Sequence, residues 1–375
     1  MQKIAELLRK QIVAIFLAVI CGFLVTAVIL AAAGYSPAES FAALFRGIYS
    51  RPKYISNTII KSTPIILTGL SVAFAFKTGL FNMGAEGQYI MGTIAATMAG
   101  LFLDLPPVLE IPVILIAGMA AGAVYGGIVG ILKAKFGIHE VITSIMLNWI
   151  ALYLNNFIVN LPAVHKPNSS GTYVINESGY TIFFNHWKTT DAGRALLEEH
   201  PFFGEMLLKT DLNAGILFAV GAVLIVIYIL KKTSKGYQMR AVGLNRDAAE
   251  SAGIPVNKTL VQSMLIAGAI SGLAGALVIT GMSPHKISTL AAFENNGWNG
   301  VSVALIAGNS PIGCLFAGLL FGGFLYGGQT LQSEVGAPSE IINIMLGTIV
   351  FFVALSRIAV ILAEKIEKRG RNHAE

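Results

Sequence analysis

The chain has 375 residues, of which 55% are hydrophobic and 12% are charged. Soluble domains carry about 25% charged residues, so this composition excludes an ordinary soluble globule. The net charge of +6 comes from 26 Lys and Arg against 20 Asp and Glu. In a membrane protein such an excess indicates topology and not a nucleic-acid partner. Cys21 and Cys314 lie in apolar runs and indicate neither a disulfide framework nor a cysteine metal site.

Apolar runs along the chain predict an all-α, polytopic integral membrane protein with eight to ten transmembrane helices of about 20 residues each. The first run, 11–34, ends in small residues as a signal peptide does. It exceeds the apolar core of about 7 to 15 residues that signal peptides have, so we expect an uncleaved helix. The runs that follow are 58–76, 83–103, 108–132, 139–161, 212–230, 258–281, 299–311, 313–333 and 340–363. Gly, Asn and Glu interrupt 83–103, and 299–311 is short.

Charge sets the expected orientation of these helices. If the N-terminus is cytoplasmic and ten helices alternate, most Lys and Arg residues fall in cytoplasmic segments, as in other membrane proteins. We therefore expect a multi-pass protein with both termini in the cytoplasm. The cluster Arg46, Arg51, Lys53 and Lys61 departs from this rule in the first outside loop.

Within a single membrane domain, 1–375, two hydrophilic segments stand out. Residues 162–211 form an outside insertion that we expect to fold as a small cap or to remain a partly ordered loop. Residues 231–257 form the longest cytoplasmic loop. Asn245 or Asp247 can cap a short helix there, and Gly253 can end it. The small residues Ala248, Ala249 and Ala252 would suit insertion of this helix into a groove on another protein. A solvated loop helix has the same pattern.

Glycines recur at helical spacing in three of the apolar runs. They are Gly118, Gly122, Gly126 and Gly130, Gly268 with Gly272, and Gly318 with Gly322. Such stripes let helix backbones approach closely. They predict tight structural packing or, alternatively, a sliding interface.

The segment 81–88 places polar residues between apolar runs. They are Asn82, Glu86 and Gln88. Irregular backbone at membrane depth must be buried in protein or line a water-filled cavity, and an ionisable group there predicts a function. The alternative places Glu86 at the cytoplasmic interface, solvated or capping a helix.

Further amides and a tryptophan offer contacts to a polar solute. They are Asn148, Asn155 and Asn156, then Asn295, Asn296, Trp298 and Asn299. Asparagine in membrane helices also bonds neighbouring helices. As candidates for a translocation path we take Asn82, Glu86, Gln88, Asn148, Asn296 and Trp298.

Enzyme motifs are missing from the sequence. It contains no G-x-x-x-x-G-K-[ST] loop, no H-E-x-x-H and no G-x-S-x-G, and its six histidines are scattered. We expect no catalytic residue, no metal site and no cofactor in this chain. A polytopic chain of this kind is most simply a transport pathway or part of one.

Three motifs together resemble a known family. The loop AVGLNRDAAESAGIPVNK, 241–258, looks like the coupling helix of ABC importer permeases of the simple-sugar and branched-chain amino-acid superfamily. FNMGAEGQYIMG at 81–92 and GWNGVSVALIAGNSPIG at 297–313 are similar to its nucleoside-type branch. The resemblance extends over about residues 55 to 362. Met83 and Trp298 depart mildly from the branch pattern, and the insertion 162–211 is unusual for it.

The resemblance implies a type II ABC importer-like permease in a bacterial inner or plasma membrane. The implied partners are a second related permease, ATP-binding subunits that hold ATP and magnesium, and an extracytoplasmic substrate-binding lipoprotein of the basic-membrane-protein type. By the same resemblance, the element that couples to the ATPase consists of Gly243, Asn245, Asp247, Ala248, Ala249 and Gly253.

The implied cargo is a small molecule, with nucleosides first and sugars or another small polar solute as the alternative. An ion-coupled secondary transporter is a rival of another class, but it normally needs carboxylates or unwound carbonyls at the midplane, and Glu86 alone is thin support. A non-transporting membrane scaffold is a second rival. It has no use for polar breaks such as ENNGWNG at 294–300.

Overall fold

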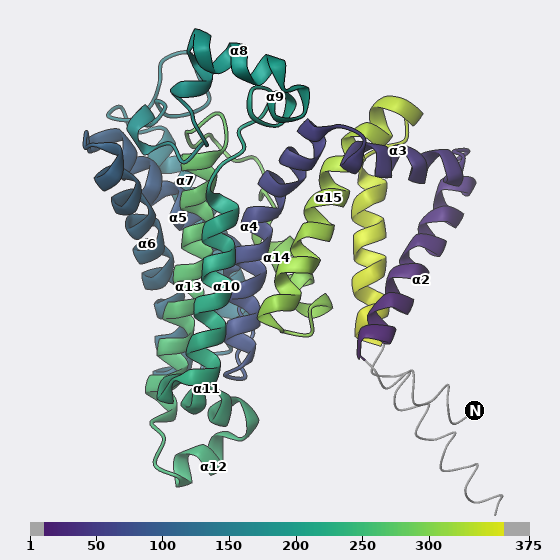
Figure 1. Cartoon of the computed structure of the whole chain (residues 1–375). Helices are drawn as coiled ribbons and strands as arrows, with labels where there is room; N and C mark the ends of the chain where they lie inside the picture. The colour runs from purple at the N-terminus through teal and green to yellow at the C-terminus, as the bar shows by residue number, and fades with distance from the viewer. Residues whose placement is uncertain (1–10, 356–375) are drawn as a thin grey trace, which may run out of the picture. The chain divides into compact units, whose positions relative to one another are not determined.

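The computed structural model describes residues 11–355, and side chains from residue 16 onward. Contacts divide these residues into two compact units, 51–323 and a smaller one that joins 11–50 to 324–355. Each unit is helical (Figure 1). The larger unit carries every candidate site residue named above.

The larger unit begins with α4 and continues into α15. Its long helices are α4 (Pro52–Phe76), α5 (Ala85–Phe102), α6 (Pro107–Phe136), α7 (Glu140–Val159), α10 (Gly215–Lys232), α13 (Val256–Gly281) and the first half of α15 (Pro311–Val335). Shorter helices are α8 (Asp191–Glu199), α9 (Pro201–Leu207), α11 (Ser234–Leu244), α12 (Arg246–Ser251) and α14 (Asn296–Ile306), with 3-10 turns at Glu177–Gly179 and Trp187–Thr189.

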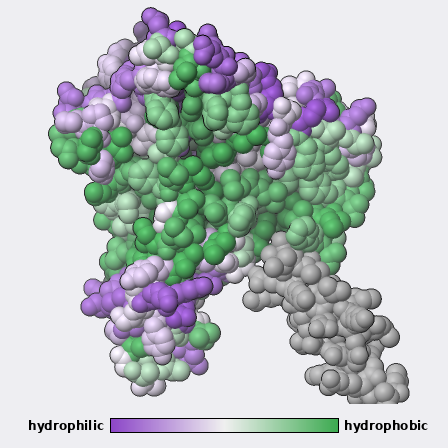
Figure 2. Space-filling view, in the orientation of Figure 1, coloured by the Kyte–Doolittle hydropathy of each residue, from purple (hydrophilic) through white to green (hydrophobic). Residues whose placement is uncertain are grey.

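Six helices in the described residues are long and apolar enough to cross a membrane: α4, α6, α7, α10, α13 and α15. Phe16–Ala32 and Glu340–Leu355 are shorter apolar helices. In the larger unit, a hydrophobic band separates the hydrophilic surface of α8 and α9 from that around α11 and α12 (Figure 2). The run at 299–311 forms α14, which has 11 residues. At 1.5 Å per residue it spans about half of a 30 Å hydrocarbon core, so it does not cross alone.

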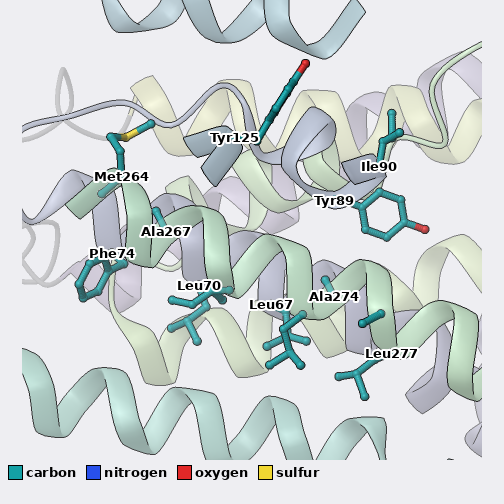
Figure 3. Packing of buried hydrophobic residues seen from close by; sticks show 14 of the residues in the cluster. Leu67, Leu70, Phe74, Tyr89, Ile90, Tyr125, Met264, Ala267, Ala274 and Leu277 are labelled. Carbon is teal, nitrogen blue, oxygen red and sulfur yellow. The ribbon is translucent and has the colours of Figure 1, made fainter. Parts of the chain in front are cut away.

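The centre of the larger unit is the packing of α13 against α4, α5 and α6. Figure 3 shows Leu67 and Leu70 of α4 beside Ala274 and Leu277 of α13. All four side chains are buried. Small alanines on α13 bring the two helices together while the leucines of α4 fill the space between them.

The glycine stripe on α6 lies on the glycines of α13, which confirms the prediction of close helix packing. A Cβ added at Gly122 would come within 3.0 Å of Gly272 Cα, and one at Gly118 would come within 3.0 Å of the Ala276 Cβ. A Cβ added at Gly268 would meet the Gly122 carbonyl carbon at 2.9 Å. The contact is therefore between two backbones, as small residues allow in membrane helices.

The smaller unit contains α2 (Gln11–Ala32), α3 (Pro37–Tyr49), the end of α15 and the helix Glu340–Leu355. Phe23 of α2 contacts Phe41 and Phe324 edge to face, with ring centroids 5.1 and 5.7 Å apart. Arg46 pairs with Glu334 at 2.7 Å. The helix α3 lies in a segment where the apolar pattern predicts no helix.

The insertion 162–211 carries α8 and α9 and bonds to the segment between α13 and α14. The Thr172 N–H donates to the Ile287 carbonyl at 3.0 Å and the Ile175 N–H to the His285 carbonyl at 3.1 Å. The Thr289 N–H donates to Ser170 at 2.8 Å. These backbone bonds hold 282–295, called here the wall segment, from its outer side.

Candidate functional site

A cavity of about 310 Å³ opens in the larger unit, between helices and the wall segment. Its lining mixes apolar and polar residues in about equal number, and three of the side chains are charged: Lys61, Lys286 and Glu294. Its volume falls in the range of small-molecule sites, which begins at about 300 Å³, and apolar surface beside placed polar groups is typical of such sites. The lining residues are Lys61 and Pro64 of α4, Tyr89, Ile90 and Thr93 of α5, Asn155 of α7, Val278 and Ile279 of α13, then Met282, Ser283, Pro284, Lys286, Ile287, Ser288, Leu290, Glu294 and Asn296.

Tyr89 and Glu294, both in the cavity lining, form a short side-chain hydrogen bond. The Tyr89 hydroxyl donates to Glu294 Oε2 at 2.6 Å. The tyrosine is fully buried, whereas Glu294 is an exposed residue of the wall segment. This bond joins a buried phenol to an exposed side chain, so Tyr89 fixes where Glu294 stands in the cavity.

Two amides of α7 hold the wall segment from the helix side. Asn155 Nδ2 donates to the Ser288 carbonyl at 2.9 Å. Asn156 bonds both ways with Leu290, donating to its carbonyl at 2.8 Å and accepting from its N–H at 2.7 Å. With the insertion on its other side, the wall segment is fixed although it has no helix or strand of its own.

His285 is a second anchor of the wall segment. Its Nδ1 lies 2.8 Å from the Ile279 carbonyl, and its ring stacks on Tyr180 of the insertion with centroids 3.9 Å apart. Burial lowers the pKa of His285. The neutral imidazole therefore joins the wall segment to α13 and the insertion.

Glu86 clamps the start of α14 by binding the residues on either side of Asn296, which lines the cavity. Its Oε1 accepts from the Asn295 N–H at 3.0 Å, and its Oε2 accepts from the Gly297 N–H. A Cβ added at Gly297 would meet the Glu86 backbone at less than 3.0 Å, so only glycine fits there. Glu86 is 1% exposed, which contradicts its placement at a solvated interface. Its carboxylate accepts hydrogen bonds from N–H groups that the start of a helix leaves without partners.

Asn82 and Gln88 bond each other and are also buried. Asn82 Nδ2 donates to Gln88 Oε1 at 2.8 Å, and Gln88 Nε2 donates to Asn82 Oδ1 at 2.9 Å. Asn82 Nδ2 also lies 3.0 Å from Ser71 Oγ of α4. The two buried amides thus supply hydrogen-bond partners to each other in the irregular segment between α4 and α5.

Asn148 of α7 fixes the same irregular segment from the other side. Its Oδ1 accepts from the Gly87 N–H at 2.8 Å, and its Nδ2 donates to the Met83 carbonyl at 2.9 Å. These two bonds occupy both ends of the amide. The side chain is buried and is not part of the cavity lining.

Of the six residues predicted for the path, Asn296 lines the cavity. Its carbonyl accepts from Thr68 Oγ1 at 2.8 Å. Trp298 is half-buried and contacts Phe293 edge to face at 6.5 Å. Asn82, Glu86, Gln88 and Asn148 lie in the surrounding buried network.

Sequence reasoning missed Tyr89 and Glu294. The signal was present, because Tyr89 directly follows the polar segment 81–88 and Glu294 begins ENNGWNG. An acidic residue beside a break in an apolar pattern indicates a functional role, and this holds for Glu294 as it does for Glu86.

The loop predicted to couple to an ATPase contains the helix α12. The Asn245 side chain caps it by accepting from the Ala248 N–H at 3.0 Å, and Gly253 ends it in a left-handed conformation with φ +79°. Asp247 and Ala248 are exposed, while Ala249 is 4% exposed and packs in the core of its own chain.

Gly243 belongs to α11 and lies directly on the segment that follows α4. A Cβ there would come within 3.0 Å of the Lys77 carbonyl carbon. Arg246 Nη2 donates to the Gly79 carbonyl at 3.3 Å. The short helix is thus connected through backbone contacts to the segment that leads into 81–88.

Residues 54–355 match the family model described as branched-chain amino acid transport system / permease component. This match covers most of the chain, including the cavity, the Glu86 clamp and the α12 loop.

The chain belongs to this permease family.

Three relatives support the assignment over nearly the whole length. The chain is 38% identical to the guanosine ABC transporter permease protein NupP of Bacillus subtilis (strain 168) over 356 residues, which cover 95% of this chain and 97% of the relative. It is 36% identical to the nucleoside ABC transporter permease protein NupB of Lactococcus lactis subsp. cremoris (strain MG1363), with 95% and 94% covered. It is also 29% identical to the glucose ABC transporter permease protein TsgB13 of Haloferax volcanii, with 91% and 86% covered.

Membership in the permease family agrees with the helices. The chain is a multi-pass membrane protein and a permease subunit of an ABC transporter, and it is not itself an enzyme. ATP hydrolysis in these systems belongs to a separate subunit. The expectation of an all-α polytopic permease is confirmed.

Proposed function

We propose that this permease subunit takes up nucleosides in an ATP-driven importer. The observation that carries the proposal is the identity of 38% and 36% to permeases named for guanosine and nucleosides, over nearly the full length of each chain. The cavity is compatible with such a cargo, because a nucleoside is a flat ring joined to a polar sugar. Apolar walls suit the ring, and a few fixed polar groups suit the sugar and the ring edge.

The partners follow from the same proposal. A second related permease completes the pathway, ATP-binding subunits hold ATP and magnesium, and an extracytoplasmic lipoprotein delivers the solute. The side of the membrane that bears α12 is cytoplasmic in this proposal, since the Lys and Arg residues of 231–258 favour that side. We also propose that both termini are cytoplasmic and that the insertion 162–211 faces outward.

In this proposal the exposed tip of α12, with Asp247 and Ala248, contacts the ATP-binding subunit. Ala249 supports the helix from its buried side. Asn82, Glu86, Gln88 and Asn148 shape the pathway by fixing α5, α7 and α14, and Asn296 and Trp298 lie where the solute passes.

Uptake in cells tests the substrate and the energy source together. Labelled guanosine, uridine, ribose and glucose are offered to cells with and without this gene, with ion gradients intact or collapsed while ATP is maintained. Nucleoside uptake that requires the gene and survives gradient collapse supports the proposal. Uptake that vanishes with the gradient favours an ion-coupled carrier. Uptake of sugars alone favours the second candidate, which the likeness to the glucose permease keeps open.

Two substitutions of one kind test the coupling contact. Asp247→Arg reverses a charge on the exposed tip of α12, and Asp104→Arg makes the same change at an exposed position between α5 and α6. We expect the first to reduce uptake and solute-stimulated ATP hydrolysis by at least about tenfold, because a reversed charge at a docking surface costs affinity. The second variant keeps both. Equal activity of the two variants would refute the role of α12.

A further inference from the structure

We infer that Glu294 is a specificity-determining residue of the cavity, and that it selects solutes which present two adjacent hydrogen-bond donors. This inference depends on the proposed function, since it assigns a task to one side chain in the nucleoside pathway. The argument begins with the geometry of the carboxylate.

Only part of the hydrogen-bonding capacity of Glu294 is used within the protein. Oε2 accepts from the Tyr89 hydroxyl at 2.6 Å. Among the residues that the structure describes, Oε1 accepts no hydrogen bond. A carboxylate has about four lone-pair positions, so both oxygens retain capacity toward the cavity.

Glu294 is also held in place by bonds to its side chain and to the backbone near it. Tyr89 is fully buried, and Leu290 of the wall segment is fixed to Asn156 by two bonds. The N–H of Asn295, the next residue, is bound to Glu86. The Glu294 carboxylate is thus held by one buried hydroxyl, and its backbone is fixed on both sides along the chain, so it loses less freedom when a ligand arrives than an unattached side chain does. Preorganised groups of this kind discriminate strongly.

The surroundings define the shape of the ligand. Ile90, Val278 and Ile279 present apolar surface in the same cavity, which Lys61 and Lys286 also line. A fitting solute therefore has an apolar face and, on one edge, two neighbouring donors that meet the carboxylate. Two parts of a nucleoside have such donor pairs, namely the 2′,3′-diol of the ribose and the N1–H with the 2-amino group of guanine.

A site built to accept particular donors rejects analogues without them much more strongly than an apolar pocket rejects a missing methylene. Glu294→Gln tests this, because it keeps the size of the side chain and turns one acceptor oxygen into a donor group. Glu340→Gln is the matched control, an exposed glutamate outside the cavity lining. Tyr89→Phe keeps the ring and removes the bond that fixes Glu294.

The measurement is the maximal uptake rate at saturating solute in cells that express the complete transporter, with the amount of permease in the membrane determined for each variant. The solutes are guanosine, 2′-deoxyguanosine and inosine. Saturation fills the extracytoplasmic receptor, so the rate reports discrimination in the permease itself.

We expect the unmodified transporter to move guanosine at least about tenfold faster than one of the two analogues, which is the effect of one lost bond to a charged group. Discrimination against 2′-deoxyguanosine identifies the ribose diol as the partner, and discrimination against inosine identifies the guanine edge. In Glu294→Gln the discrimination collapses to less than about threefold, Tyr89→Phe weakens it, and Glu340→Gln leaves it unchanged.

If the unmodified transporter discriminates and Glu294→Gln discriminates equally, Glu294 does not select the solute. If guanosine and both analogues are moved at one rate, the inference is likewise overturned. If no nucleoside enters at all, the proposed function itself fails, and that result is distinct from the other two.

Discussion

Replacing Gly268 of α13 by alanine tests the backbone contact between α6 and α13. The added Cβ would lie 2.9 Å from the Gly122 carbonyl carbon and 3.2 Å from Gly126 Cα. Both neighbours are backbone atoms that cannot rotate away, so the helices must separate. Overpacking costs about 1 to 3 kcal/mol. Because the neighbours are rigid, we take the upper end and subtract about 1 kcal/mol for the better helix propensity of alanine, which leaves a net loss of about 2 kcal/mol.

Gly221→Ala is the matched control for this substitution. Gly221 lies within α10, and nothing stands within 4 Å of a Cβ added there. The same chemical change then contributes only helix propensity and stabilises by about 1 kcal/mol. The two variants should differ by about 3 kcal/mol in the free energy of unfolding.

Thermal unfolding of the detergent-purified protein, followed with a thiol-reactive dye, measures this difference. Cys314 is 0% exposed and reacts only when the helices open, whereas the half-buried Cys21 is removed by Cys21→Ser in every sample. We expect the midpoint to fall for Gly268→Ala and to rise or stay constant for Gly221→Ala. Equal midpoints for the two variants would refute the close packing of α6 on α13.

Three further predictions concern polar groups. Glu86→Ala removes the acceptor of the buried Gly297 N–H and of the Asn295 N–H, which lies at an exposed residue. We expect a loss of about 1 to 3 kcal/mol from the buried group, measured by the same unfolding assay, and a loss below about 1 kcal/mol would contradict the clamp. Because burial lowers the pKa of His285, the neutral ring stabilises the folded protein above the unfolded pKa of 6.5, and this stabilisation is lost as the pH falls below that value. His285→Phe should therefore flatten the decline in the unfolding midpoint between about pH 6.5 and 5. An unchanged slope would argue against a buried neutral ring. The hydrogen bond from Arg51 lowers the pKa of Glu205, so Glu205→Gln should lower the midpoint slightly at low salt above pH 4.5, and the difference from the unmodified protein should vanish at 1 M salt, where the screening length is about 3 Å. A difference that persists at 1 M salt would require another explanation.

Most of the helices were predictable because apolar length and glycine spacing are local signals. The run 258–281 lies within α13 and 108–132 within α6. The glycines at every fourth position of α6 contact α13 as their spacing predicts. Length alone, however, could not distinguish a full crossing from the short α14, which ends at a turn of residues 307–310.

The helix α3 was missed although its start carries a known signal. Ser36 caps it by accepting from the Glu39 N–H, and Pro37 occupies its first position. The sequence S-P-A-E is a capping pattern, but the helix is amphipathic and lacks the long apolar run on which the span prediction relied.

The partners of the polar residues were beyond sequence reasoning. Glu86 bonds to residues more than 200 positions away, and Tyr89 bonds to Glu294 across a similar separation. Only the fold brings such residues together. The sequence identified 81–88 and 294–300 as polar breaks, yet which side chains meet the cavity and which serve the backbone depends on that pairing.

The Glu86 clamp has a consequence for the charge of the cargo. The start of a helix ordinarily attracts anions, and membrane transporters use such half-helices to hold anionic groups. Here the protein's own carboxylate already occupies N–H groups at the start of α14. An anionic group would therefore gain little from this helix end. Any negative charge on a solute in the cavity would instead have to be met by Lys61 and Lys286 of the lining, so the contacts that bind charge there come from side chains and not from a helix start.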